Sequence, residues 1–382
     1  MQERCQSVCA RTGRPGDNVV KIIVQPGDGV LPLIRGISSA KSSVEIVIFR
    51  FDQREIERAL ANAVSRGVAV HALIAHTNRA GEEHLRELEL RLLGAGVTVA
   101  RTADDLARYH GKMMIVDRRE LYLLAFNLTH ADIERSRSFG LVTRSRDLVR
   151  EACKLFDADT KRHPYEPGAN RFVVSPLNAR KELAAFIKGA RKELVIYDPK
   201  ISDPAMLRLL SERAAAGVEI RVIGRVTKKL AGTRVHKPAA MRLHTRTMVR
   251  DKSFAFIGSQ SLRELELDGR REVGIIFRDT RIVNRLHKVF EEDWAVCERC
   301  DVSLPAEDTE PTVKIAKKVA KALTKELPPV APLLDGVMRE VVGENGDVEL
   351  NAEEVEQIVK GAVKEAVKEV VRDVMEEAVV NR

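Results

Sequence analysis

One pattern of residues occurs twice along the chain, and this duplication limits the folds open to it. Three segments of the first half recur in the same order in the second half: 44–51, 55–73 and 110–127 match 193–199, 205–223 and 244–261. A pattern repeated at this scale is typical of two homologous structural units in one chain. We therefore expect two related halves.

The spacing between the two copies is not constant. It is 150 positions between Gly67 and Gly217 but 134 between His110 and His244, so the second half is shorter by about 16 residues. This is close to the length of the helix expected after His76. The corresponding region of the second half, 227–240, is basic and loop-like, and it either rims a site or forms an ordinary solvated connection.

Each half alternates strand and helix patterns. The apolar, β-branched run 43–51 predicts a buried strand, Asp52 occupies the place of a helix N-cap, and a helix with apolar residues at helical spacing extends to Gly67. A strand over 68–76, a helix over 82–93 and a strand over 97–101 follow. The apolar runs 112–117 and 121–127 predict a hairpin joined at 118–120. The fold class expected is α/β, with two homologous mixed-sheet halves.

Composition changes after about residue 301. An acidic, proline-containing stretch leads into a basic helix, a proline break and a long amphipathic helix with regularly spaced valines. We divide the chain into an N-terminal extension, a first half, a second half, and a linker with a helical C-terminal appendage, at 1–23, 24–160, 161–300 and 301–382. The helices of the appendage are expected to dock on the body, on a partner or on a second copy of the chain.

Charge is distributed unevenly. The formal net charge is +8, but residues from Asp301 onward carry 18 acidic against 11 basic side chains, so the first 300 residues carry about +15. This favours an anionic partner, although charge alone does not choose among nucleic acid, phospholipid headgroups and isolated phosphate esters. Five scattered cysteines, with the single CxxC pair Cys297 and Cys300, favour neither a disulfide framework nor a zinc site, and no metal is expected.

The residues with chemical potential lie at one spacing in both copies. His110, Lys112 and Asp117 follow the pattern HxKxxxxD, and His244, Arg246 and Asp251 repeat it with arginine in place of lysine. On a strand, residues two apart face the same side, so each imidazole and its neighbouring cation are expected to point into one cleft. Ten positions beyond each aspartate stand Asn127 and Ser261, and Ser259 lies close by. These small polar groups are candidates to donate to a phosphoryl oxygen.

Two copies of this motif within matching halves resemble the phospholipase D superfamily, whose mark is HxKxxxxD followed by GSxN, used twice. The resemblance covers about residues 24–296 and implies a fold of two α/β halves packed face to face. It implies a phosphodiesterase in which one histidine attacks phosphorus, giving a phosphohistidine, while the other protonates the leaving alcohol. By resemblance we assign His110 as nucleophile, His244 as general acid, and Lys112 and Arg246 as the cations that hold the phosphate. No cofactor is implied.

Some positions depart from the family pattern. The family often places an acidic residue about 28 positions after each histidine to orient the imidazole, and that offset gives Glu272 for His244 but Ser138 for His110. Asp132 or Glu134 is the candidate substitute in the first half. Asp117 and Asp251, at strand ends, also fit a purely structural role in turns.

Three functions follow. The first is a phospholipase D-like or cardiolipin synthase-like enzyme that hydrolyses or transfers a phosphatidyl diester; the second is a nuclease of the same superfamily; the third is a degenerate, phosphate-binding scaffold. Phospholipid is the preferred substrate and nucleic acid the alternative. With no apolar stretch of about 18 residues and no secretory leader, the sequence predicts a cytoplasmic protein with peripheral contact at a membrane.

Overall fold

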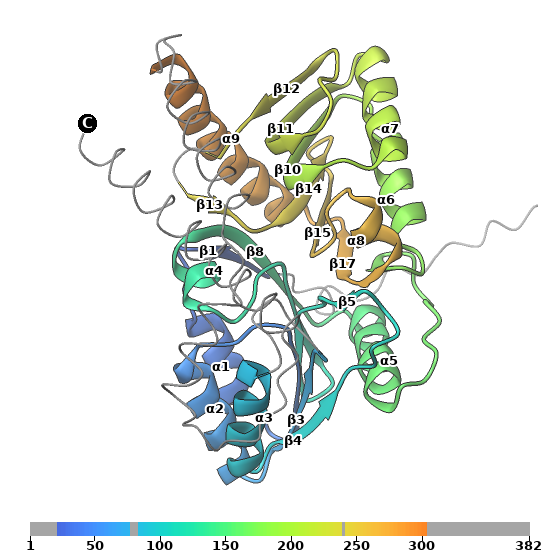
Figure 1. Ribbon diagram of the computed structural model, residues 1–382. Helices are drawn as coiled ribbons and strands as arrows, with labels where there is room; N and C mark the ends of the chain where they lie inside the picture. Colours follow the sequence, from blue (N-terminus) through green and yellow to red (C-terminus); the bar gives the residue numbers. More distant parts are fainter. Residues whose placement is uncertain (1–20, 77–82, 239–240, 304–382) are drawn as a thin grey trace, which may run out of the picture. The chain divides into compact units, whose positions relative to one another are not determined.

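The computed structural model describes residues 21–76, 83–238 and 241–303, which contain two large mixed sheets (Figure 1). The predicted N-terminal extension and the helical C-terminal appendage lie largely outside these residues. The boundaries at 24, 161 and 301 stay predictions; β1 already begins at Lys21, and α9 ends at Ser303.

The first half is built around the sheet β1-β8-β7-β6-β2-β3-β4. Its strands and helices follow the chain in the order β1 (Lys21–Gln25), α1 (Leu31–Ser39), β2 (Ser43–Ile48), α2 (Arg54–Ser65), β3 (Ala69–Ile74), α3 (Glu83–Gly94), β4 (Thr98–Arg101), β5 (Arg108–Tyr109), β6 (Met113–Val116), β7 (Glu120–Leu124), α4 (His130–Glu134), β8 (Ser136–Thr143) and α5 (Arg146–Lys161). Strands β2, β3 and β4 are parallel, while β6, β7, β8 and β1 are antiparallel to their neighbours.

The second half is built around the sheet β12-β11-β10-β14-β15-β17-β9. Its elements are β9 (Phe172–Val174), α6 (Ala179–Lys188), β10 (Glu193–Ile201), α7 (Pro204–Ala215), β11 (Glu219–Val226), β12 (Thr233–His236), β13 (Arg242–Leu243), β14 (Arg246–Arg250), β15 (Phe254–Gly258), α8 (Glu264–Asp268), β16 (Arg270–Arg271), β17 (Val273–Phe277) and α9 (Thr280–Ser303).

The duplication predicted from the sequence is confirmed element by element. The central strands β2, β3, β6 and β7 of the first sheet correspond in order and pairing to β10, β11, β14 and β15 of the second. The described residues between β11 and β12 form no helix that would correspond to α3. The shortening of the second half therefore removes one helix and leaves the basic loop that the sequence indicated.

Three layers of apolar packing hold the fold together. In Figure 1, α1, α2 and α3 cover one face of the first sheet, and α6 and α7 cover the outer face of the second. A third buried cluster lies between the halves and includes residues of α5 and α9 together with the inner faces of both sheets, among them Val47, Met113, Phe139, Tyr197, Val249 and Phe290. Burial of this shared core fixes one half against the other.

Two local predictions are wrong. The N-cap of α2 is Gln53, whereas Asp52 accepts a hydrogen bond from the backbone N–H of His130 at 2.8 Å. His110 and Lys112 also do not lie on one regular strand. Residues 110–112 fall between β5 and β6, because Tyr109 pairs with β16 while Met113 pairs with β2. At His110 the chain therefore passes from the small β5–β16 sheet to the large sheet of the first half.

The aspartates of the two motifs are turn residues that tie neighbouring loops together. Asp117 follows β6 with φ of 52°, and its carboxylate accepts hydrogen bonds from the backbone N–H groups of Lys41, Ser42 and Ser43 at 2.7–3.1 Å. Asp251 has φ of 51° and accepts in the same way from residues 191–193. The bonds to Ser42 and Ser43 help lower the pKa of Asp117, although its partial burial acts in the opposite direction.

We expect Asp117→Ala to lower the free energy of unfolding by about 1–3 kcal/mol, because it removes these acceptors and leaves alanine at a positive φ. Asp117→Asn keeps an oxygen acceptor and tolerates the backbone conformation, so it should lose about half as much. Chemical denaturation measures both, with the exposed Asp104→Ala as the matched control. Equal stability of wild type and Asp117→Ala would show that the loop is held by other contacts.

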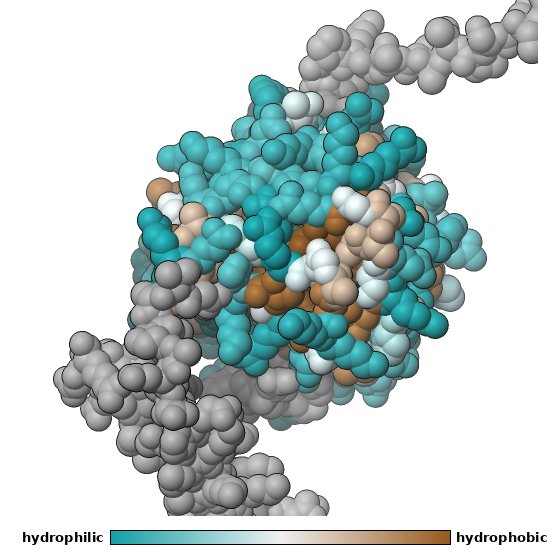
Figure 2. Space-filling view, turned by 90° about the horizontal axis from the view of Figure 1, so that it is seen from above, coloured by the Kyte–Doolittle hydropathy of each residue, from teal (hydrophilic) through white to brown (hydrophobic). Residues whose placement is uncertain are grey.

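No helix within the described residues is both long enough and apolar enough to cross a bilayer. Figure 2 shows hydrophobic side chains gathered at the centre of the face seen from above, inside a hydrophilic rim. Patches of this kind mark contact sites in many proteins. Peripheral contact with a membrane stays a prediction.

Candidate functional site

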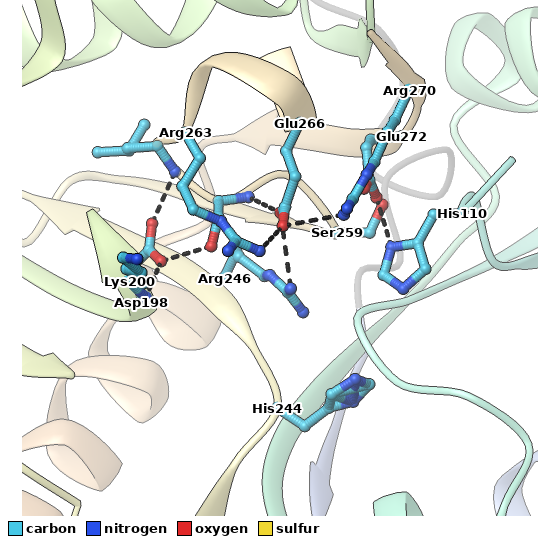
Figure 3. Close-up of polar contacts among 12 residues, drawn as sticks. His110, Asp198, Lys200, His244, Arg246, Ser259, Arg263, Glu266, Arg270 and Glu272 are labelled. Carbon is cyan, nitrogen blue, oxygen red and sulfur yellow. Dashed lines mark hydrogen bonds and ion pairs between the residues drawn. The ribbon is translucent and has the colours of Figure 1, made fainter. Parts of the chain in front are cut away.

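A short ribbon made by both halves carries the first histidine. Strand β5 pairs in parallel with β16 of the other half, and the backbone N–H of His110 donates to the carbonyl of Arg271 at 2.7 Å. Because Glu272 is the residue after Arg271, this ribbon brings it to His110. Nδ1 of His110 is hydrogen-bonded to Oε2 of Glu272 at 2.8 Å, and the Glu272 side chain is fully buried (Figure 3).

The second histidine is held in the same way from the opposite side. Strand β13 pairs with β8 of the first half, and the backbone N–H of His244 donates to the carbonyl of Arg137 at 3.1 Å. The hydroxyl of Ser138 donates to the carbonyl of His244 at 3.0 Å. Nδ1 of His244 lies 2.9 Å from Oδ2 of Asp132.

The expected pairing of acids with histidines is therefore wrong. Glu272 contacts His110, not His244, and Asp132 contacts His244, not His110; each imidazole is held by a carboxyl group of the other half. Glu134, the other candidate substitute, forms an exposed pair with His130. An offset counted within one half could not reveal a contact that crosses between halves.

Two cations are buried beside the histidines. Lys112 is 3% exposed, and its Nζ donates to the backbone carbonyl of His110 at 2.7 Å. Arg246 is 7% exposed at the start of β14; its Nη2 lies 3.5 Å from Oε2 of Glu266, while its Nε and Nη1 have no hydrogen-bond partner among the described residues. Buried donors without partners are rare in folded proteins. They are available for an anionic group.

The carboxylate of Glu266 organises the arginines of the second half. It is fully buried, accepts a hydrogen bond from the backbone N–H of Ser261 at 2.8 Å, and contacts Arg246, Arg263 and Arg270 (Figure 3). Burial raises the pKa of Glu266, but the charges of Arg246 and Arg263 outweigh this effect and hold the pKa below its usual range. Sequence reasoning missed Glu266. It lies 134 positions after Asp132, the spacing of the two histidines.

The small polar residues of the motif make hydrogen bonds within the site, and Asn127 also lines the hollow beside Asp132. The Nδ2 group and backbone N–H of Asn127 both donate to Oδ2 of Asp132. The hydroxyl of Ser261 donates to Asp198 at 2.6 Å, so that hydrogen is not directed at a phosphoryl oxygen as expected. Ser259 is fully buried, and its hydroxyl oxygen accepts from the backbone N–H of Val273 at 3.1 Å.

Burial sets the protonation of the site. It lowers the pKa of His110 well below its usual range, and the charges of Lys112 and Arg246 lower it further. Burial also lowers the pKa of His244 to about 4, although Asp132 acts in the opposite direction. Both imidazoles are therefore neutral at pH 7 before an anion binds. A neutral imidazole can attack an electrophile or take up a proton.

Burial also shifts the pKa values of the neighbouring ionisable groups in the direction that favours their neutral forms. It lowers the pKa of Lys112 to about 7 and raises that of Glu272 to about 8, where the nearby Glu266 adds to the increase. Burial would also raise the pKa of Asp132, but its contacts with His244 and Arg242 hold it below the usual range. Asp132 is therefore ionised at pH 7, and Glu272 carries a proton for much of the time.

One cluster of potential metal ligands exists in the part of the chain that the structure describes. Glu193, His287 and Glu291 bring three ligand atoms within 4.8 Å of one another. The guanidinium of Arg221 already contacts both carboxylates of this cluster, with Nη2 at 2.6 Å from Glu193 and 2.5 Å from Glu291. The arrangement is that of an ion-pair network between β10, β11 and α9.

Comparison with known proteins gives a consistent family. The model of the cardiolipin synthase PLD-like domain matches residues 33–160 and 183–294. The chain is 24% identical over 299 residues to polyphosphate kinase of Prosthecochloris aestuarii, covering 69% of this chain and 41% of that protein. It is 28% identical over 130 residues to mitochondrial cardiolipin hydrolase of Danio rerio, covering 33% of this chain and 56% of that protein.

A solved structure shares the fold of this chain. The crystal structure of phosphatidylserine synthase from Haemophilus influenzae superposes with a TM-score of 0.56 at 11% identity, covering 73% of this chain and 86% of that one. The chain spans about half the length of the curated relatives that it matches. The names of these three proteins denote different reactions, so similarity alone does not assign one of them to this chain.

Proposed function

The chain belongs to the phospholipase D-like family, and on that premise we propose that it is a phosphodiesterase acting through a phosphohistidine intermediate. Phosphatidyl-type diesters are the first substrate class, cleaved by water or transferred to an alcohol. The observation that carries the proposal is the crossed arrangement of two histidines, in which Nδ1 of each lies within 2.9 Å of a buried carboxyl oxygen of the opposite half. This leaves both Nε2 atoms for chemistry.

The first step forms a bond between Nε2 of His110 and phosphorus while the bond from phosphorus to the leaving alcohol oxygen breaks. His244, protonated once the anionic substrate binds, gives its proton to that oxygen. In the second step His244 takes a proton from water or an acceptor alcohol, whose oxygen attacks phosphorus and releases His110.

We assign His110 as the nucleophile because both cations that would hold the phosphate act on its imidazole. Among the charged groups around His110, Lys112 and Arg246 lower the pKa of its imidazole most. Both of these side chains are buried. A phosphoryl group seated between these two cations would therefore face His110. In the view of Figure 3, the nitrogen of His110 that Glu272 does not contact points to the side on which His244 lies.

A nuclease is the second candidate, and one cavity supports it. A hollow of about 1110 Å³ beside Asp132 is lined by five arginines, including Arg50, Arg54 and Arg58. Four carboxylates also line this hollow, so its arginines leave a small positive excess for the phosphates of an extended polyanion. A binding-only scaffold, the third candidate, requires that no diester be turned over.

We expect turnover of bis(4-nitrophenyl) phosphate to persist in excess EDTA, because histidines supply the nucleophile and acid and Lys112 and Arg246 supply the positive charge. The release of 4-nitrophenol measures it with and without chelator. Phosphatidylglycerol micelles and single-stranded DNA, each assayed at two salt concentrations, separate the first two functions, since nucleic-acid binding weakens steeply with salt.

Loss of activity in EDTA with recovery on adding a divalent cation would contradict the mechanism. Absence of turnover on every diester, in a protein that is folded by circular dichroism, would leave the binding-only scaffold.

A further inference from the structure

A second cavity, of about 640 Å³, lies on the second-half side of the histidines. Four cationic side chains line it, from Lys200, Arg225, Arg242 and Arg263, and none of its described lining residues is acidic. The larger hollow beside Asp132 differs in this respect, because four carboxylates stand among its arginines. The lining of the smaller cavity is therefore cationic, although Arg242 and Arg263 also contact the carboxylates of Asp132 and Glu266 behind it.

The backbone of this wall is shaped by a β-bulge. The pairing of β10 with β11 shifts between Asp198 and Ile201, and the backbone N–H of Lys200 donates to the Asp198 carboxylate at 2.9 Å. On the facing strand, Gly224 has φ of 148°, and a Cβ there would come within 1.8 Å of the carbonyl oxygen of Asp198. Bulges beside active sites redirect side chains. Here the bulge places Lys200 at the cavity.

The cavity adjoins the catalytic centre through two of its arginines. Arg242 comes two residues before His244 and contacts Asp132, the carboxylate that holds that histidine. Arg263 shares the carboxylate of Glu266 with Arg246. In the view of Figure 3, Arg246 lies between Lys200 on one side and His110 on the other. A ligand that occupies both the catalytic centre and this cavity would extend from the histidines past Arg246 toward Lys200.

The cations of this region outnumber the carboxylates that pair with them. The single carboxylate of Glu266 is shared by three arginines. Nε of Arg263 is shielded from solvent without a hydrogen-bond partner in the described part of the chain, and no ion pair with a described residue is formed by Lys200 or Arg225. Guanidinium groups arranged in this way match the oxygens of a phosphate.

We propose that this cavity is a second phosphate site, which binds a phosphate one sugar or one glycerol unit away from the phosphate that is cleaved. The inference rests on the proposed phosphodiesterase function and specifies its substrate: a molecule with two phosphates rather than an isolated diester. A nucleic-acid strand and a lipid with two phosphates share this chemistry.

The test compares ligands that differ by one phosphate. Calorimetry measures the dissociation constants of thymidine 5′-phosphate and thymidine 3′,5′-bisphosphate for the wild-type protein and for the double variant Lys200→Gln/Arg225→Gln. We expect the bisphosphate to bind wild type about 10- to 100-fold more tightly, as charge-assisted hydrogen bonds would give, and the double variant to lose most of this ratio. Lys288→Gln, an exposed cation on α9, is the matched control and should keep the wild-type ratio.

Turnover assays then distinguish a nucleic-acid substrate from a lipid substrate with two phosphates. Thymidine 5′-(4-nitrophenyl phosphate) with and without a 3′-phosphate is compared with cardiolipin and phosphatidylglycerol in the same micelles, and the pair with the larger ratio of kcat/KM identifies the natural source. Equal dissociation constants for the two nucleotides in wild type, or an unchanged ratio in the double variant, overturn the second site. Because binding is measured without turnover, that failure is distinct from failure of the phosphodiesterase proposal.

Discussion

Replacement of His110 or His244 by alanine is expected to lower diester turnover by about four to six orders of magnitude, since removing one member of a catalytic unit costs nearly as much as removing the unit. The two variants should differ in what accumulates. With a 4-nitrophenyl diester the leaving group needs no acid, so His244→Ala can still form the bond between His110 and phosphorus. It cannot activate water to break that bond. Acid-quench mass spectrometry should therefore detect phosphorylated His110 in His244→Ala.

The control for this experiment is His71→Ala, an exposed histidine on β3, which should turn over like wild type. His110→Ala should show neither turnover nor adduct. An adduct on His244 would reverse the assigned roles while keeping the two-histidine mechanism. Full activity in both variants would exclude this centre as the site of reaction.

The repeat was enough to predict the main course of the chain. It predicted paired halves, the hairpin of β6 and β7, and the loss of one helix in the second half, because these depend on local patterns of apolar residues and on spacing. The positions of His110 and His244 also followed from the motif. Both histidines lie at the seam between the halves, where β5 pairs with β16 and β13 pairs with β8.

What the sequence could not predict are the contacts across that seam. Glu272 and Asp132 each follow a histidine along the chain, so counting positions assigned them to the histidine of their own half. The ribbon of β5 and β16 instead carries Glu272 to His110. Asp198 and Ser261 are likewise 63 positions apart, and only the packing of β10 against the segment after β15 shows that they share a hydrogen bond. Tertiary pairing, not local pattern, decides such contacts.

The contact between Glu272 and His110 gives the second large prediction. We expect Glu272→Gln to lower kcat by about two to four orders of magnitude. The amide oxygen can still accept the Nδ1 hydrogen, but it supplies no negative charge to stabilise the cationic phosphohistidine. KM should change little, because Glu272 does not hold the phosphate. A structural role alone would change stability without this specific loss of kcat.

The same substitution should stabilise the fold in a pH-dependent way. Burial raises the pKa of Glu272 to about 8 in the folded protein, while an unfolded glutamate titrates at about 4.3. Between these two pKa values, Glu272 is ionised in the unfolded chain but protonated in the folded chain. The wild-type free energy of unfolding therefore falls as pH rises through this range, and the decrease is complete above about pH 8. Glutamine does not titrate. The advantage of Glu272→Gln should therefore grow from pH 5 to pH 9, to a few kcal/mol.

Urea denaturation at pH 5 and pH 9, together with kcat at pH 7, measures both effects on the same preparations. Glu264→Gln, an exposed carboxylate on α8, is the control and should alter neither kcat nor the pH dependence of stability. A stability difference that is equal at the two pH values would mean that Glu272 titrates normally and that its proton is not retained by burial. A gain in stability accompanied by a loss of kcat would show instead that the buried carboxyl group is kept for the reaction at a cost to the fold, because the charge that His110 needs is the charge that burial disfavours.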